Sequence, residues 1–204
     1  MSDKFLDRAY NIRDPNAIHQ LYDAWAASYE AEVGENGYAA PARCAAALSR
    51  FVDDKDQPVL DFGCGTGLSG LALRMAGFNV IDGYDVSSEM LVQAQSKMIY
   101  RHLEKIEPGA ELTHEPGKYA AIAAIGVIGR GAAPISVFDI LMHGLGKGGK
   151  LVFTFNDHAL EDKANEGRLN EWTDCGAAHL LYRDYGPHMP GINLNSNVYV
   201  VEKA

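Results

Sequence analysis

Cysteine is scarce in this sequence, which has three cysteines among its 204 residues. Cys44, Cys64 and Cys175 lie far apart and form neither a metal-binding nor a disulfide pattern, so we expect a protein of the reducing cytoplasm. Long hydrophobic runs are also missing, and residues 1–4 do not begin a signal peptide. We therefore expect no membrane-spanning segment and no membrane partner.

Basic residues are in the minority, with 18 lysines and arginines against 27 acidic residues and a net charge of −9. Because nucleic-acid phosphates attract a basic surface, this balance argues against a nucleic-acid partner and mildly favours a small or cationic substrate. Cysteine and histidine do not cluster, so we predict no metal site. Hydrophobic residues make up 47% of the chain, which suits a globular protein of one domain, residues 1–204.

Glycines alternate in one stretch, residues 58–68, which reads PVLDFGCGTGL. A short apolar run contains Asp61, and three glycines follow at alternate positions. Glycine at Gly63 and Gly65 lets the backbone approach a ligand without a clashing Cβ. Apolar residues then recur with the spacing of a core-facing helix, at Leu68, Leu71, Ala72, Met75 and Ala76. We predict a strand, a glycine turn and a helix that begins beside the turn.

A second acid, Asp85, follows a strand-like stretch at residues 78–84, about one βα repeat after Asp61. In folds of this kind, the acid that ends the second strand accepts hydrogen bonds from ribose hydroxyls. The dinucleotide fingerprint G-x-G-x-x-G/A would place its third small residue where this chain has Leu68. That difference argues against a nicotinamide-dependent enzyme.

Residues 59–67 and 83–91 together resemble the first two motifs of the class I S-adenosylmethionine-dependent methyltransferases. Residues 146–154 resemble the segment that leads into the family's fifth strand, with Lys147 in place of its proline. The resemblance implies an α/β fold, a Rossmann-like three-layer sandwich with helices on both faces of a mostly parallel, seven-stranded sheet. The implied strand order is 3-2-1-4-5-7-6, with the last strand antiparallel. It also implies S-adenosylmethionine as cofactor and S-adenosylhomocysteine as product.

By the same resemblance, a set of residues binds the cofactor. Asp85 accepts from the ribose, and Val86 packs against adenine. Two roles are open for Asp61, which either bonds the cofactor's amino group or ties down the N–H groups of the glycine turn. We expect Cys64 to be a small residue in a tight loop rather than a nucleophile. The predicted set is Tyr22, Tyr29, Asp61, Gly63, Cys64, Gly65, Asp85, Val86, Met90, Ile125 and Gly126.

Asp14 and Pro15 predict the start of an N-terminal helix that carries Tyr22, Trp25 and Tyr29 on one face. Residues 22–30 resemble the Y-D-x-W-A-x-x-Y-D/E signature of a small-molecule subgroup, which includes methyltransferases likened to the Williams–Beuren region protein. This implies that residues 1–51 form an arm and lid helices, with Trp25 near the substrate. The aromatic side chains fit a lid and a packed core equally well, so both roles stay open.

The rest of the chain alternates strands and helices. Residues 100–118 show no periodicity, and the acid that the family uses to bind adenine has no clear counterpart there. Asn156 and His158 follow the fifth strand at its ligand end and are predicted acceptor-side residues, with a surface loop as the alternative reading. Asp157 is expected to cap a helix that reaches Trp172. Further predicted elements are helices over 41–51 and 134–144 and strands over 119–128, 150–155, 179–182 and 197–202.

These features predict a cytoplasmic methyltransferase that passes a methyl group to a small molecule by in-line displacement. Such a reaction needs orientation and exclusion of water rather than a nucleophilic side chain, and a general base only for acceptors such as a hydroxyl. The N/D-P-P-Y/F stretch of amide and adenine N-methyltransferases does not follow the fourth predicted strand. The alternative is a non-catalytic S-adenosylmethionine-binding regulatory protein, because Ala120 replaces a family acid and the adenine acid is missing.

Overall fold

The computed structural model describes residue 5 and residues 15–204, with side chains placed for residue 5 and from residue 20 onward. The Asp14 cap and the predicted arm, apart from Phe5, lie outside the described residues, as does the side chain of Ile18 on the predicted helix face. Helix α2 (Pro15–Trp25) begins at the predicted proline. None of the described helices is long and apolar enough to cross a membrane.

The described chain builds one seven-stranded sheet in the order β3-β2-β1-β4-β5-β7-β6, which confirms the predicted order. The five strands from β3 to β5 are parallel, and β7 runs antiparallel to both of its neighbours, β5 and β6. The strands are β1 (Val59–Phe62), β2 (Ile81–Asp85), β3 (His102–Lys105), β4 (Ala121–Ala124), β5 (Lys150–Asn156), β6 (Ala178–Met189) and β7 (Leu194–Lys203).

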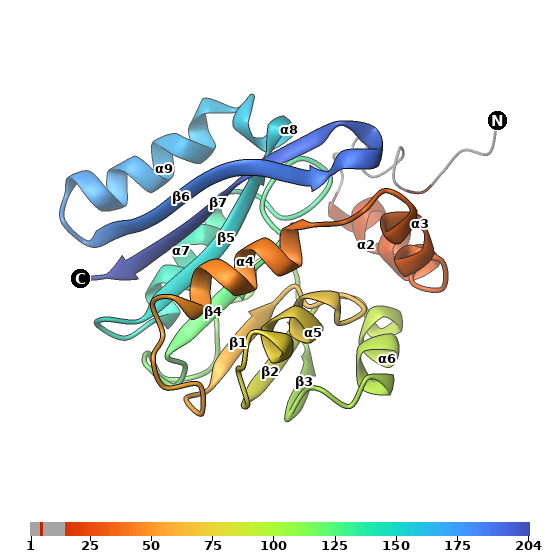
Figure 1. Ribbon diagram of the computed structural model, residues 1–204, viewed down its shortest axis with the longest axis horizontal. Helices are drawn as coiled ribbons and strands as arrows, with labels where there is room; N and C mark the ends of the chain where they lie inside the picture. The colour runs from red at the N-terminus through yellow and green to blue at the C-terminus, as the bar shows by residue number, and fades with distance from the viewer. Residues whose placement is uncertain (1–4, 6–14) are drawn as a thin grey trace.

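Helices cover both faces of this sheet (Figure 1). On one face α4 and α5 bury an alanine-rich layer against β1, β4 and β7. On the other face α7 and α9 pack on β4, β5 and β7. The remaining helices are α3 (Tyr29–Glu35), α4 (Ala40–Ser49), α5 (Leu68–Met75), α6 (Ser88–Ser96), α7 (Ser136–Gly144), α8 (Asp157–Leu160), α9 (Lys163–Asp174) and the short η1 (Pro190–Ile192).

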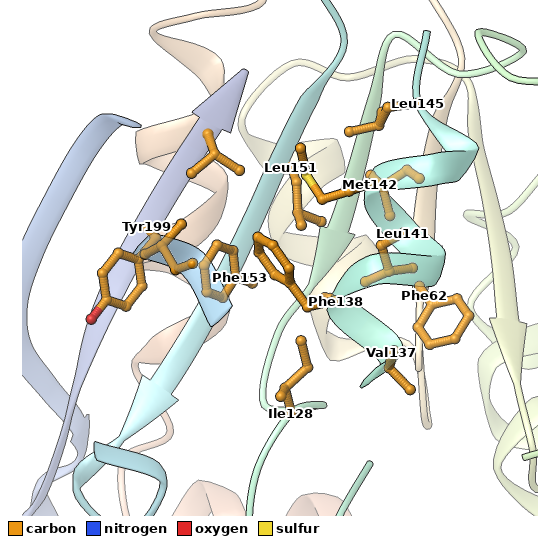
Figure 2. Close-up of a cluster of buried hydrophobic side chains, with 14 of the residues drawn as sticks. Phe62, Ile128, Val137, Phe138, Leu141, Met142, Leu145, Leu151, Phe153 and Tyr199 are labelled. Carbon is orange, nitrogen blue, oxygen red and sulfur yellow. The ribbon is translucent and has the colours of Figure 1, made fainter. Parts of the chain in front are cut away.

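The α7 face holds most of the large buried side chains (Figure 2). Phe138 of α7 points at Phe153 of β5, with ring centroids 5.3 Å apart in an edge-on arrangement. Phe153 in turn stacks on Tyr199 of β7 at 5.0 Å. Aromatic pairs in these geometries stabilise a core beyond the area they bury. This core fixes β4 and β5, whose carboxyl ends carry several candidate site residues.

The N-terminal region differs from the single lid helix predicted from the sequence. The N–H of Ser28 donates to the carbonyl of Trp25 at 2.9 Å, which closes a tight turn after α2, and Tyr29 begins the separate helix α3. Tyr29 therefore does not share a helix with Tyr22 and Trp25. Helix α4 packs on the sheet beside α5, so the helices outside the sheet layers are α2 and α3. Figure 1 shows these two helices beside the turn of the β6–β7 hairpin.

Several other elements differ from those predicted from the sequence. The helix expected from Asp157 to Trp172 is two helices, α8 and α9, capped by Asn156 and Asp162. Asp157 instead accepts from the Tyr185 hydroxyl at 2.7 Å and from the Asn195 N–H at 2.9 Å, so it holds the hairpin. Strand β3 lies in the stretch without periodicity. Its side chains are half-buried or exposed at the sheet edge, so they leave no hydrophobic pattern in the sequence. The predicted strand over 119–128 shortens to β4, whereas that over 179–182 lengthens to β6.

Candidate functional site

The glycine turn joins β1 to α5, as predicted. Gly63, Gly65 and Gly67 all have positive φ, at 69°, 52° and 96°, a region where side chains are strained. The N–H groups of Gly63 and Cys64 donate to the Tyr84 carbonyl at 2.7 and 3.0 Å, so the turn is pinned to the end of β2. No described atom lies within 4 Å of the place a Cβ at Gly65 would take. Gly65 thus faces open space.

Asp85 lies beside this turn and is 8% exposed. Its Oδ2 accepts from the N–H of Gly65 at 2.8 Å, and its Oδ1 accepts from the N–H of Ser87 at 2.9 Å. The cap of α6 is Ser87, whose hydroxyl oxygen accepts from the Met90 N–H at 3.1 Å. Asp85 is therefore no helix cap, and it couples the glycine turn to the loop that enters α6.

Asp61 is fully buried at the start of the turn. Its Oδ2 accepts from the Ser69 hydroxyl at 2.6 Å and from the Tyr100 hydroxyl at 2.7 Å. Its Oδ1 is buried and has no hydrogen-bond partner among the described residues. Burial raises the pKa of the carboxyl to about 6, although both hydroxyls oppose the shift. Asp61 thus ties the first turn of α5 to Tyr100 rather than tying down the glycine turn itself.

Tyr100 is a site residue that the sequence analysis missed. Its ring lies between Gly70 of α5 and Gly83 of β2, where added Cβ atoms would come within 2.3 and 2.9 Å of the tyrosine. The side chain therefore packs only because both positions are glycine. Burial and the charge of Asp61 raise the pKa of its hydroxyl far above the usual range, so the hydroxyl stays a donor to the acid.

The side chains of Cys64 and Val127 pack against the glycine turn. The Cys64 thiol is 3% exposed, and burial raises its pKa well above the ordinary value, which leaves the side chain protonated and unreactive. The side chain of Val127, just after β4, lies 2.5 Å from where a Cβ at Gly63 would be. Gly63 is thus crowded by protein, whereas Gly65 is open.

Two tethers hold α2 and α3 against the turn side of the sheet. The Ser87 hydroxyl donates to Asp23 of α2 at 2.5 Å, next to Asp85. Lys97 donates to Glu30 of α3 at 2.5 Å and to the Thr66 carbonyl at 2.8 Å. These contacts attach both helices to the glycine turn and to the first turn of α6.

The aromatic side chains of these helices pack together around Trp25, which is 1% exposed. Its ring lies 5.7 Å from that of Tyr22 and 4.8 Å from that of Tyr29. The Tyr22 hydroxyl donates across to the Gly131 carbonyl at 3.3 Å, so α2 reaches the loop after β4. Trp25 is therefore the buried centre of the cluster formed by α2 and α3, and all three aromatic side chains line the cavity beneath these helices.

A cavity lies beneath α2 and α3, at the carboxyl ends of β4 and β5, with about 530 Å³ of empty space when its opening to solvent is included. Its floor is Thr154 of β5, whose Oγ1 accepts from the Gly126 N–H at 2.9 Å. Gly126 has a φ of 71°, and the Tyr38 hydroxyl lies 2.6 Å from where its Cβ would be. Residues from six segments meet here, including Tyr22, Trp25, Tyr38, Gly126, Asn156 and His188.

The predicted residues divide between these two parts of the site. Those of the glycine turn, with Asp85, lie at the ends of β1 and β2, and Met90 is buried in α6 behind them. Gly126, the three lid aromatics and Asn156 line the cavity, and Ile125 is buried just before Gly126. His158 instead lines a separate hollow with Arg130 and Glu161. No group of three metal-ligating side chains was found among the described residues.

A model of the methyltransferase domain family matches residues 37–193. The chain belongs to this family. Human methyltransferase-like protein 27 is 32% identical over 136 residues, which cover 65% of this chain and 56% of the human protein. The 18S rRNA (guanine(1575)-N(7))-methyltransferase of Saccharomyces cerevisiae is 30% identical over 118 residues, which cover 51% of this chain and 43% of the yeast protein.

A solved structure shows the same fold. Magnesium protoporphyrin IX methyltransferase from Synechocystis PCC 6803, with bound SAM, superposes with a TM-score of 0.61 at 15% identity, covering 98% of this chain and 90% of that one. At this identity the likeness is one of fold. The chain spans about half the length of the curated relatives it matches.

Proposed function

We propose that this chain is an S-adenosylmethionine-dependent methyltransferase that methylates a small molecule by in-line displacement. Membership of the methyltransferase domain family and the fold shared with a SAM-bound enzyme support the reaction class. The observation that carries the proposal is the buried Oδ1 of Asp61, which no described residue pairs, beside an open glycine turn. An unpaired carboxylate oxygen in that position fits a ligand with a cationic amino group, as this cofactor has.

Each part of the turn side then has a role toward the cofactor. Asp85 receives the ribose hydroxyls, because this acid ends β2 beside the glycine turn, where folds of this kind bind ribose. Gly63, Cys64 and Gly65 form the backbone cradle. Apolar contact comes from Val86, Met90 and Ile125, and Gly126, Tyr22 and Tyr29 close the methionine end.

The bound cofactor supplies an activated methyl group, so the chain's residues chiefly orient the reactants and exclude water. The lid helices serve that exclusion, since α2 and α3 cover the cavity and are tethered to the turn through Asp23 and Glu30. Trp25 and Asn156, which line the cavity, lie on the acceptor side.

A small-molecule acceptor suits the cavity. Aromatic side chains line it, and two helices cover it, as is usual for a site that encloses a small ligand. The net charge of −9 is unfavourable for an RNA acceptor such as the one named for the yeast relative. Methylation of ribosomal RNA but of no small molecule would overturn this part of the proposal.

Calorimetric titration of S-adenosylhomocysteine into the purified protein and into Asp85→Ala tests the cofactor assignment. Losing a charged hydrogen-bond acceptor should weaken binding by about 1–3 kcal/mol. Because Asp85 also holds Gly65 and Ser87, circular dichroism must show that the variant is folded. Asp174→Ala, which removes an exposed acid at the end of α9, is the matched control and should bind as wild type. If S-adenosylhomocysteine does not bind to the wild type, the proposal is wrong.

A second candidate function is a non-catalytic cofactor-binding protein. The observations in its favour are Ala120 in place of a family acid and the absence of a clear adenine-binding acid in residues 100–118. Isotopically labelled methyl transfer from S-adenosylmethionine to any compound of a metabolite extract would remove this candidate. Binding without transfer across such extracts would favour it.

A further inference from the structure

Two buried polar atoms without partners line the same cavity. Neither Nε1 of Trp25 nor Nδ1 of His188 has a hydrogen-bond partner within the described part of the chain. Trp25 is 1% exposed and His188 is 2% exposed, so bulk water does not reach these two atoms. Because nearly all buried polar groups in native proteins are paired, two such atoms around one cavity indicate a ligand that pairs them.

His188 was not among the residues predicted from the sequence, and its place at the end of β6 is firmly set. Its carbonyl accepts from the Ala39 N–H at 2.9 Å, and its ring lies 5.2 Å from that of Tyr38. The charged groups that act on the ring are Arg43, which opposes its protonation, and Asp157, which favours it.

Burial lowers the pKa of His188 to about 4, with Arg43 adding to the shift. At neutral pH the ring is therefore uncharged, with one N–H donor and one acceptor nitrogen. A neutral ring with so low a pKa is a weak base but remains a good hydrogen-bond acceptor. It suits an uncharged donor such as a hydroxyl better than a carboxylate, which would favour the charged ring.

The walls of the cavity favour a flat ring that carries polar groups, because Arg130, Thr154 and Asn156 line it together with aromatic side chains. Four aromatic side chains line it, those of Tyr22, Trp25, Tyr29 and Tyr38, with Met189 beside them. Aromatic walls bind flat rings well and leave the few polar atoms to fix orientation. The cavity also touches Gly126, which is itself a proposed cofactor residue, so a ligand in the cavity would lie next to the methionine end of the cofactor.

We propose that this cavity holds the methyl acceptor and that the acceptor is an aromatic hydroxy compound. Its hydroxyl donates to the ring of His188, and an oxygen of the compound accepts from Nε1 of Trp25. This inference rests on the proposed function, in which the cavity binds the methyl acceptor. It adds the chemical class of that reactant and an acceptor-binding residue.

A matched pair of probes tests it. 2-Naphthol can donate a hydrogen bond to His188, and 2-methoxynaphthalene cannot, although the ring system is the same. Fluorescence titration should show wild type binding 2-naphthol about three- to tenfold more tightly, the value of one neutral hydrogen bond. His188→Phe should abolish the preference, whereas His188→Gln, which keeps an acceptor oxygen, should retain it. His179→Phe changes an exposed histidine of the same strand and is the control.

The titrations are repeated with saturating S-adenosylhomocysteine, and the nitrogen-15 resonances of His188 are followed by NMR. We expect both ligands to bind together and 2-naphthol to shift the His188 resonances. Equal binding of the two probes, no binding of 2-naphthol, or competition between 2-naphthol and S-adenosylhomocysteine would overturn the inference. If 2-naphthol binds as expected but S-adenosylhomocysteine does not bind at all, the proposed function fails instead.

Discussion

The two parts of the site are built in opposite ways. The turn side, made of Asp61, Asp85, Tyr100 and the glycine turn, is tightly packed, and its carboxylates already hold backbone and hydroxyl donors. The cavity side, under α2 and α3, keeps empty space beside its two buried polar atoms without partners in the described chain, whereas Asp61 Oδ1 and Thr66 Oγ1, which also lack such partners, lie within the packed turn side. A packed, bonded region holds one shape, whereas a region with unpaired groups and space gains stability when a ligand fills it.

This difference also appears in the titration of two buried groups. Burial raises the pKa of Asp61 to about 6 and lowers that of His188 to about 4, so both favour the uncharged form. An acid with a raised pKa stabilises the fold at low pH, and a histidine with a lowered pKa stabilises it at high pH. The two parts of the site should therefore respond to pH with opposite signs.

The largest effect is expected on the cavity side, for His188→Phe. Below the pKa that His188 has in the unfolded chain, the unfolded state binds a proton but the buried ring stays neutral. Wild type therefore loses stability as pH falls toward 4. Relative to the variant, wild type should lose about 2–3 kcal/mol of unfolding free energy between about pH 7.5 and 4.5. Urea denaturation at both pH values measures this, with His179→Phe as control. A constant difference between wild type and the variant would contradict it.

Asp61→Asn should show the opposite dependence on the turn side. The stability that the protonated carboxyl contributes at low pH is lost as pH rises through about 6. Relative to wild type, the amide variant should gain about 2 kcal/mol between about pH 4.5 and 7.5. The same urea series measures it. The variant should also lose affinity for S-adenosylhomocysteine, and a variant that lost stability as pH rose would refute the assignment.

Gly70→Ala measures how tightly the turn side is packed. A Cβ at this position would lie 2.3 Å from the Tyr100 hydroxyl, and the ring cannot retreat because Gly83 confines it from the other side. We expect a loss of about 2 kcal/mol, the usual cost of overpacking a core. Gly167→Ala is the matched control, because no described atom lies within 4 Å of its Cβ position in α9. Thermal denaturation should show that alanine stabilises at Gly167, and equal effects at both positions would contradict the packing argument.

Much of this fold could be predicted because buried strands leave apolar runs. Strands β1 and β5 and helix α5 follow local patterns that the sequence displays directly. Strand β3 leaves no such run, since it lies at the sheet edge with every side chain at least partly exposed. Most of β6 is likewise exposed or half-buried, and only a short piece of it was predicted. Edge strands are set by pairing with a neighbour, which a single sequence does not display.

The site divides in the same way. Asp61, Gly63 and Asp85 could be predicted as candidate residues because glycine spacing and strand ends are local signals. Tyr100 was missed because its partners, Asp61 and the two glycines beside its ring, are distant in sequence. His188 sits before a proline and a glycine that suggest only a turn, and its burial depends on α4 and η1. The sequence contains one indirect signal for Tyr100, which is Gly70 inside a helical pattern. A glycine there is unfavourable for the helix and suggests that another group packs closely against it.

The smallest effect is expected where the two parts of the site are joined, at Lys97. Its ammonium group donates to Glu30 of the lid and to the Thr66 carbonyl of the glycine turn, and the glutamate is 43% exposed. Because solvent screens such pairs, Lys97→Met should cost only about 0.5 kcal/mol in denaturation experiments. Lys163→Met, at the exposed start of α9, is the control. Hydrogen exchange should nevertheless quicken in α3 and not in α5, because the tether restrains the lid while the turn has its own bonds. Equal quickening in both helices would mean that the lid and the turn open as one unit.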